Sequence, residues 1–187
     1  PLQMLFRVPA AVENPARIRE SCGRFFAAVL RETERVGKPL PDVLEALVLG
    51  VEQLYPAMLC SILLLDNDGK RFERGIAPSL PDFYNKALDG FAIGMGAGSC
   101  GTAAFTRQRV IVEDIATHPN WAKYREIALP VGLRACWSTP ILSSKGDVLG
   151  TFAMYYREPR LPTEAEQQWV QAATHLAGIA IHASNTR

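Results

Sequence analysis

The chain is 187 residues long, which is enough for one large domain or for one domain of ordinary size with an extension. Apolar residues make up 48% of it and charged residues 21%, a balance typical of a folded protein that excludes extensive disorder. Its 20 Lys and Arg are interspersed with 19 Asp and Glu, so the net charge of +1 gives no electrostatic reason to expect a nucleic-acid partner.

Nothing in the sequence signals export or membrane insertion. No apolar run approaches the roughly 18 to 20 residues that span a bilayer, and no basic segment precedes an apolar one at the start. The four cysteines form no CxxC pair, which favours free thiols in a reducing cytoplasm over a metal site. Because the chain begins with Pro1 rather than Met, we expect a piece of a longer polypeptide, and one that makes no membrane contact itself.

Residues 1–40 predict an extended leader followed by an amphipathic helix. Three prolines fall within residues 1–15. From Arg17 onward the apolar residues recur at intervals of three and four, as on one face of a helix. They are Ile18, Cys22, Phe25, Phe26, Val29 and Leu30. We interpret residues 1–40 as a leader with a signalling or dimerisation helix, and residues 41–187 as one domain that includes a C-terminal helix.

The domain predicts helices and strands with hairpins near both ends. Asp42 is placed to cap the first helix, and the pair Thr163 and Glu166 forms a capping box for the last one. In chain order we expect a helix at 43–54, strands at 58–65 and 72–76, a short helix at 81–90, a turn and helix start at 94–105, a strand at 109–115, a loop and helix at 117–129, strands at 133–142 and 148–156, and a final helix from 164.

This order predicts an α+β fold built on a central, mainly antiparallel sheet of five to six strands. The terminal helices would cover one face and the middle segments the other. A ligand-type cavity would then lie between the sheet and the middle segments. Its wall would be the stretch 91–140, which opens with the glycine-rich turn "GMGAGSCG" at 94–101.

The succession of motifs resembles a GAF domain over about residues 41–183. The hairpin "LLLDNDGKRF", the turn "GSCGTAAF", the strand "VIVEDI", the strand "STPIL" and the strand "VLGTF" follow in the order and spacing of that family. The motif sequences "GSCGTAAF" and "LRACWSTPI" are similar to those of GAF modules that accompany PAS domains in bacterial histidine kinases and in GGDEF and EAL cyclic-di-GMP enzymes. The fold expected is therefore GAF/PAS-like.

The resemblance implies a regulatory domain that is not itself an enzyme. Such a domain senses a small molecule or a redox state and relays it through terminal helices that form a parallel homodimer, where His175 and His182 would lie. The output module, a two-component kinase or a cyclic-di-GMP enzyme, would lie elsewhere in the protein. The other hypotheses are a thiol-dependent enzyme or switch of the free methionine-(R)-sulfoxide reductase type and a ligand-free dimerisation module.

The candidate ligand pocket comes from the stretch 91–140. Its predicted residues are Phe91, Gly98, Ser99, Cys100, Phe105, Asp114, Trp121, Tyr124, Arg134, Cys136, Trp137 and Ser138. Cys100 is either a small buried filler or a nucleophile with Cys136 as its resolving partner. Arg134 either binds an anionic group or pairs with an acidic residue. The aromatic pair, Trp121 and Tyr124, either stacks on a planar ligand or packs the core.

The sequence leaves the ligand unknown and argues against three cofactors. Haem would depend on His118, a single histidine in a loop before proline. Bilin attachment in the family uses a Cys-His pair, whereas Cys136 is followed by Trp137. The cyclic-nucleotide members carry an Asn-Lys pair, present here as Asn85 and Lys86, but also a Phe followed by Asp-Glu that this chain lacks.

Overall fold

The computed structural model describes residues 38–185 together with Gly23, Ala27 and Arg31. Its centre is a five-stranded antiparallel sheet in the order β2–β1–β5–β4–β3. The strands are β1 (Leu59–Leu65), β2 (Phe72–Ile76), β3 (Val110–Val112), β4 (Ala135–Leu142) and β5 (Val148–Tyr156). The predicted α+β fold with a mainly antiparallel sheet is confirmed.

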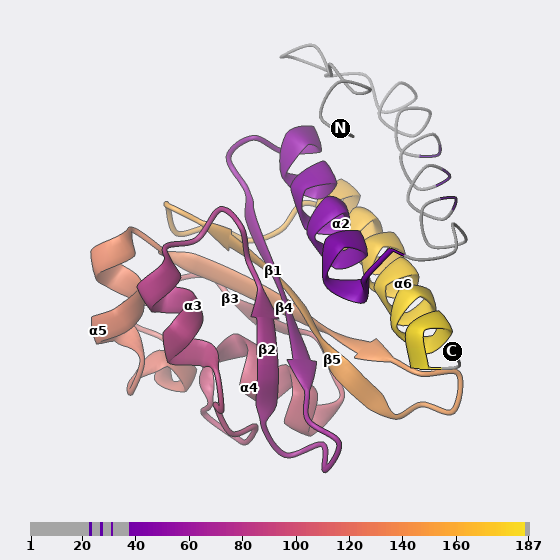
Figure 1. The fold of residues 1–187 in the computed structure, drawn as a ribbon. Helices are drawn as coiled ribbons and strands as arrows, with labels where there is room; N and C mark the ends of the chain where they lie inside the picture. Colours follow the sequence, from indigo (N-terminus) through magenta and orange to yellow (C-terminus); the bar gives the residue numbers. More distant parts are fainter. Residues whose placement is uncertain (1–22, 24–26, 28–30, 32–37, 186–187) are drawn as a thin grey trace.

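Helices cover both faces of the sheet, as the element order predicted. On one face two long helices lie side by side, α2 (Leu40–Leu54) and α6 (Glu164–Asn185) (Figure 1). The other face carries three shorter helices, α3 (Asp82–Leu88), α4 (Gly98–Thr106) and α5 (Arg125–Ala128), with 3-10 turns η2 (Pro119–Trp121) and η3 (Leu129–Val131). Most of the predicted helix of the leader falls outside the described part of the chain; Gly23, Ala27 and Arg31, which are described, are helical. Within the described part, no helix is both long and apolar enough to cross a bilayer.

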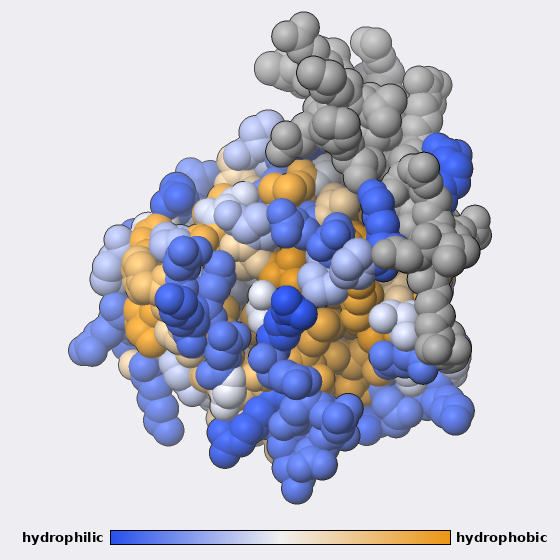
Figure 2. Space-filling model, viewed as in Figure 1, coloured by the Kyte–Doolittle hydropathy of each residue, from blue (hydrophilic) through white to orange (hydrophobic). Residues whose placement is uncertain are grey.

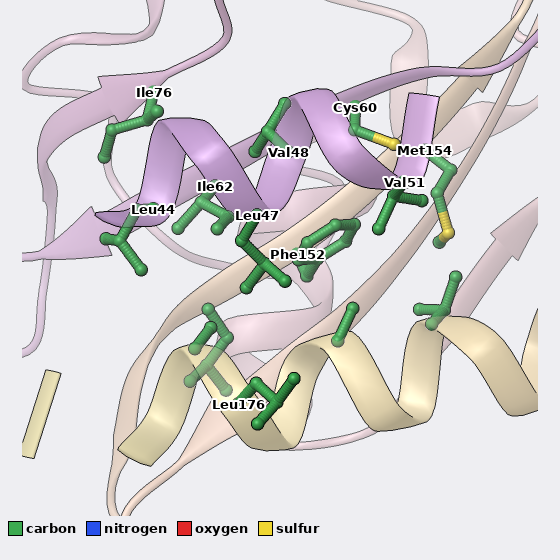
Figure 3. Close-up of a cluster of buried hydrophobic side chains, with 14 of the residues drawn as sticks. Leu44, Leu47, Val48, Val51, Cys60, Ile62, Ile76, Phe152, Met154 and Leu176 are labelled. Atoms are coloured by element: carbon green, nitrogen blue, oxygen red, sulfur yellow. The ribbon is translucent and has the colours of Figure 1, made fainter. Parts of the chain in front are cut away.

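Side-chain alternation along the strands divides the core into two clusters. On β5, Phe152 and Met154 point toward α2 and α6, while Ala153 and Tyr155 point toward α4. Figure 3 shows the first cluster, in which Leu44, Leu47 and Val51 of α2 meet Phe152 and, from α6, Leu176. Since both faces of β4 and β5 are covered, these strands are buried along nearly their whole length.

The surface in the view of Figure 2 is largely hydrophilic. Hydrophilic side chains cover most of the face in Figure 2, and hydrophobic ones gather in its middle and at the edge that carries α5. Leu129, directly after α5, is 36% exposed.

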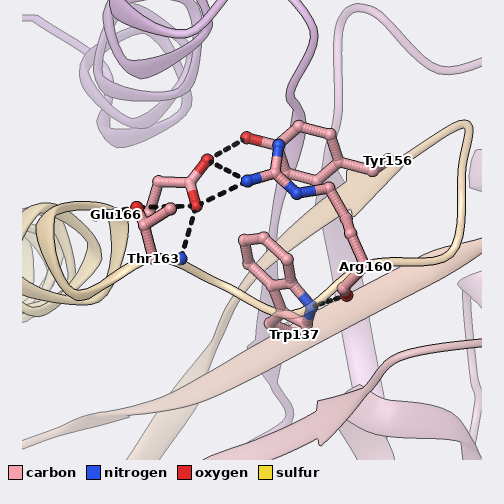
Figure 4. Close-up of polar contacts among 5 residues, drawn as sticks. All are labelled: Trp137, Tyr156, Arg160, Thr163 and Glu166. Carbon is pink, nitrogen blue, oxygen red and sulfur yellow. Dashed lines mark hydrogen bonds and ion pairs between the residues drawn. The ribbon is translucent and has the colours of Figure 1, made fainter.

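The start of α6 is held to β5 by one buried carboxylate. Glu166, 4% exposed, accepts hydrogen bonds from the hydroxyl of Tyr156, from the guanidinium of Arg160 and from Thr163, whose backbone N–H and Oγ1 lie 2.7 and 2.9 Å from Oε2 (Figure 4). The Thr163 hydroxyl in turn accepts from the Glu166 N–H at 3.2 Å, which completes the predicted capping box. Arg160 stacks over the Tyr156 ring at 4.2 Å.

Two local expectations were wrong. Asp42 does not cap α2, which begins two residues earlier at Leu40; Pro41 there fits the first helical turn because its fixed φ is already helical. The loop and helix predicted at 117–129 contain only four residues of α-helix, those of α5, between the 3-10 turns η2 and η3. Pro119 and Pro130 lack the N–H that a continuous helix needs, and each lies in one of the short 3-10 turns.

Replacing Gly150 by Ala should destabilise the fold by about 3 kcal/mol, because overpacking a close contact is costly. The added Cβ would collide with the Leu63 carbonyl oxygen in β1, a backbone group held by the β1–β5 ladder. Urea unfolding monitored by circular dichroism measures the change. Gly94→Ala is the matched control, since no heavy atom lies within 4 Å of its added Cβ. Equal midpoints for the two variants would contradict the observed packing of β5 on β1.

Candidate functional site

A small cavity lies between the sheet and the short helices, on the side where the sequence predicted one. Its free volume is about 30 Å³, which is room for about one or two water molecules. Leu63 and Tyr155 of the sheet, Tyr84 of α3 and Ser99 and Cys100 of α4 form its inner part. The more exposed rim consists of Ala87, Leu88, Phe91, Tyr124 and Ile127.

The glycine-rich turn shapes the α4 side of this cavity. Gly96 and Gly98 have φ of 73° and 61°, values that glycine adopts without steric cost. Gly101 is required for a different reason: an added Cβ would lie 2.6 Å from the Ala97 Cβ and 3.0 Å from the Phe91 ring. The turn therefore lets α4 start directly against the cavity-lining aromatic residues.

Ser99 links three separate segments at the inner end of the cavity. Its Oγ accepts a hydrogen bond from the Trp121 Nε1–H at 2.9 Å and donates to the Cys136 carbonyl at 3.2 Å. The first residues of α4, the η2 turn and β4 are thus joined through one buried hydroxyl. Trp121 is 5% exposed, and its ring lies against Gly98.

Cys100 lies in a cluster of buried thiols and hydroxyls. Its Sγ is 3.9 Å from the Tyr155 hydroxyl, which is itself 3.2 Å from the Ser61 Oγ. Hydrogen bonding from the Cys136 thiol, assisted by the hydroxyls of Ser138, Thr151 and Tyr155, lowers the pKa of Cys100 from 9.0 to about 7 in spite of its burial. Burial and the neighbouring Cys100 raise the pKa of Cys136 well above the ordinary thiol value.

Two hydroxyls of this cluster have no other partner. The oxygens of Ser138 and Thr151 are fully buried, and in the described part of the chain neither makes a hydrogen bond of good geometry to another group. A buried hydroxyl without a partner costs free energy. Both can turn toward the Cys100 sulfur, so the cluster is arranged around that atom.

The structure does not bring all the predicted residues together. Phe91, Gly98, Ser99, Cys100, Trp121 and Tyr124 line the cavity. Cys136 and Ser138 lie just beneath it on the same face of β4. Trp137 points to the opposite face, where its Nε1–H donates to the Arg160 carbonyl at 3.2 Å, because neighbouring strand residues alternate.

Three other predicted residues lie away from the cavity. Arg134 forms an ion pair with Asp114, in which the Arg134 Nη2 lies 3.2 Å from each carboxylate oxygen. The Arg134 side chain is 39% exposed and that of Asp114 is 24% exposed. Of the two alternatives for Arg134, the structure contains the pairing with an acidic residue. Phe105, 55% exposed, lies in a broad surface depression that the β1–β2 turn also lines.

The histidines do not form a metal site within the described residues, where no group of three potential ligands occurs. The Nδ1 of His118 accepts a hydrogen bond from the Asn120 N–H at 3.2 Å and so caps the η2 turn. His175 and His182 lie on α6, on the face of the sheet opposite the cavity. None of the three is among the residues that line the cavity.

Several cavity residues were missed by sequence reasoning. They are Leu63, Tyr84, Ala87, Leu88, Ala97, Ile127 and Tyr155. Tyr155 could have been found, since alternation along β5 places it on the α4 face with Thr151 and Ala153. The α3 residues carried no such signal, because a seven-residue helix does not indicate how it docks.

Comparisons with known proteins agree with this architecture. A family model described as the GAF domain matches residues 37–182. The methyl sulfide methyltransferase-associated sensor of Methanosarcina acetivorans is 46% identical over 153 residues, which cover 81% of this chain but only 15% of that protein. Free methionine-R-sulfoxide reductase from Neisseria meningitidis, solved with its substrate, has a TM-score of 0.71 at 18% identity and covers 98% of this chain and 99% of its own. The GAF domain of a phosphoenolpyruvate-protein phosphotransferase from Coxiella burnetii has a TM-score of 0.65 at 21% identity, with coverage of 88% and 95%.

Ultraviolet titration of the thiolate should reveal one thiol with a pKa of about 7. Cys100 is protonated below that pH and ionised above it, so the absorbance rises through neutral pH. The rise should be absent from Cys100→Ser and shifted to higher pH in Cys136→Ala, which loses the main donor. Cys60→Ser is the control, because burial raises the pKa of Cys60 well above the ordinary range. A wild-type midpoint near 9.0 would contradict the role given to the cluster.

Proposed function

The chain belongs to the GAF domain family, and from this we propose that it is the sensory module of a larger signal-transduction protein. It would detect a small molecule or a redox state in the cavity and transmit the result to an output module through α6. The sensor from Methanosarcina supports this proposal, since 46% identity over most of this chain relates the domain to a protein described as a sensor. The matched region is a small part of that protein, so the output belongs to the remainder.

One observation carries the proposal: the cavity and the anchor of α6 share adjacent residues of one strand. Tyr155 lines the cavity, and Tyr156 donates its hydroxyl hydrogen to Glu166 at the start of α6. The two side chains project from opposite faces of β5. A displacement of the strand at Tyr155 would therefore also move Tyr156 and, through its hydrogen bond to Glu166, the start of α6. Burial and the hydrogen bond to Glu166 raise the pKa of Tyr156, which keeps this hydroxyl a donor.

A second connection runs from the cavity side to the N-terminal part of α6. Arg109, in the short connection from α4 to β3, donates to the side-chain oxygens of Gln167 and Gln171 at 2.9 and 3.0 Å. Its Nε also donates to Thr139 of β4 at 3.2 Å. A shift of α4 would therefore reach α6 by a route other than Glu166. A ligand biases such a relay only by binding its two states with different affinity.

The proposal extends to the assembly of the protein, its output module and its location. We place the module in a homodimer formed through the terminal helices, in a two-component kinase or a cyclic-di-GMP enzyme. The described cysteines Cys60, Cys100 and Cys136 are all free, which supports a reducing, cytoplasmic setting. Ile179, 40% exposed on α6, supports a contact between helices.

Two other functions compete with ligand sensing. A thiol enzyme of the methionine-(R)-sulfoxide reductase type is favoured by the proximity of the Cys136 thiol to Cys100. The structural likeness to that enzyme supports the shared fold alone. A ligand-free dimerisation module is favoured by the cavity's small volume of about 30 Å³. Native mass spectrometry of the protein purified from its own host separates these from the sensor, which should retain a small molecule in one of its states.

Sedimentation equilibrium should show a dimer at tens of micromolar, and Ile179→Glu should weaken it by about tenfold or more, since a charge would be buried without a partner. Ala165→Glu is the matched control: the same new carboxylate lies at an exposed position in the first turn of α6. Equal dissociation constants for the two variants would exclude α6 as the contact.

Removing the Trp121 side chain should create a site for indole, because the hole keeps the Ser99 hydroxyl that accepts the ring N–H. The variant Trp121→Ala should lose about 4 kcal/mol of stability and regain part of it with indole. Indole should also slow amide hydrogen exchange in α6. Trp137→Ala, with the same deletion on the other face of the sheet, is the control and should show no such response.

Two results would contradict the proposed relay or the proposed cavity. If indole binds Trp121→Ala and α6 exchange does not change, the cavity does not communicate with the helix. If indole stabilises neither variant, the cavity does not admit a planar molecule. Should Trp121→Ala fail to fold, Trp121→Leu leaves a smaller hole for the same measurement with benzene.

A further inference from the structure

We infer that Cys100 and Cys136 form a reversible thiol–disulfide site whose oxidant is a small hydroperoxide that reaches Cys100 through the cavity. Such a site would supply the redox signal of the proposed sensory function. It rests on that function only for the expectation that oxidation alters α6. Its chemistry can be tested in the isolated chain whether or not the relay exists.

The two cysteines are brought together by elements far apart in sequence. Cys136 of β4 lies directly opposite Tyr155 of β5 in the antiparallel ladder. The Tyr155 hydroxyl reaches the Cys100 sulfur, at 3.9 Å. Ser99, next to Cys100, holds the Cys136 carbonyl at 3.2 Å. The first turn of α4 is therefore fixed over Cys136, with both thiols on the same side of the sheet.

The environment distinguishes the two sulfurs. Cys100 has the cavity on one side and the hydroxyls of Ser138, Thr151 and Tyr155 on the other. Cys136 lies deeper and is fully buried. The other groups that act on the pair are hydroxyls, those of Ser99, Ser138, Thr151, Tyr155 and Tyr84. The unpartnered hydroxyls of Ser138 and Thr151 are the kind of donors that stabilise a thiolate, which makes Cys100 the attacking sulfur and Cys136 the resolving one.

The reaction balances with one equivalent of peroxide. The Cys100 thiolate attacks one oxygen of the hydroperoxide, the O–O bond breaks, and Cys100 becomes a sulfenic acid while the other oxygen leaves as hydroxide or alkoxide, which takes up a proton. The Cys136 sulfur then attacks the sulfenic sulfur, the S–O bond breaks, and the thiol proton leaves with the hydroxyl group as water. Two electrons pass from the two thiols to the peroxide. A cellular dithiol reductant would reverse the step by thiol–disulfide exchange.

The cavity restricts which oxidants can react. Its free volume of about 30 Å³ fits hydrogen peroxide, which is little larger than water, and Cys100 is 8% exposed. A bulky hydroperoxide or an oxidised tripeptide would have to displace Phe91 and Tyr124 of the rim, whose rings pack edge to face with centroids 4.8 Å apart. Cys60 provides an internal comparison, because it is fully buried in the other core cluster, against α2.

The proposal is tested on the reduced 187-residue chain by titration with hydrogen peroxide, followed by intact mass and peptide mapping. Wild type should lose two hydrogen atoms and yield one Cys100–Cys136 cross-linked peptide, and dithiothreitol should restore both thiols. Cys136→Ser should stop at a Cys100 sulfenic acid that dimedone traps. In Cys100→Ser, Cys136 should stay reduced. Cys60→Ser should behave as wild type.

Several outcomes would overturn the proposal. These are oxidation of Cys60 before Cys100, a cross-link between chains in place of the internal one, or thiols that persist under peroxide in folded wild type. Cumene hydroperoxide should react at least about tenfold more slowly than hydrogen peroxide, because the rim is close-packed; equal rates would refute the cavity as the route. If Cys136→Ser does not fold, Cys136→Ala removes the same sulfur without adding a polar group. Methionine sulfoxide reduction by wild type at enzymatic rates would assign the pair to catalysis instead.

Discussion

The antiparallel pairing of β4 with β5 is the constraint on which the rest of the molecule depends. These two central strands are buried on both faces, so each residue along them belongs to one of two cores. A one-residue shift of β5 would exchange Tyr155 with Tyr156, and the same shift of β4 would turn Trp137 toward the cavity face. The pairing therefore decides at once what lines the cavity and what holds α6.

Two of the buried polar side chains, Glu166 and Ser99, connect separate elements. Glu166 is a buried carboxylate whose oxygens accept hydrogen bonds from Tyr156, Arg160 and the capping residue Thr163. Removing one partner of such a group leaves a buried charge uncompensated, so the network favours one position of α6 on the sheet. Ser99 does the same for α4 with a neutral hydroxyl and two partners. Both junctions are made with β4 or β5, the two strands that the two faces share.

The cluster around Cys100 is built differently. Its hydroxyls on β4 and β5, Ser138 and Thr151, are buried with no partner other than the Cys100 sulfur, a cost that packing with Ala or Val would have avoided. A core designed for stability alone has little use for two thiols and several hydroxyls around one sulfur. Their arrangement lowers the pKa of Cys100 and leaves Cys136 protonated beside it. The chemistry proposed for the pair follows from this asymmetry.

The sequence by itself determined the order of helices and strands, the antiparallel sheet, the capping box at Thr163 and the glycine turn before Cys100, because periodicity, capping and backbone freedom are local properties. It also placed the cavity on the correct side of the sheet. Only the tertiary structure decided that Trp137 faces away from the cavity, that Arg134 pairs with Asp114, and that Tyr155 completes the site. Those facts depend on strand register and on contacts between residues as far apart as Cys100 and Tyr155, which no local pattern encodes.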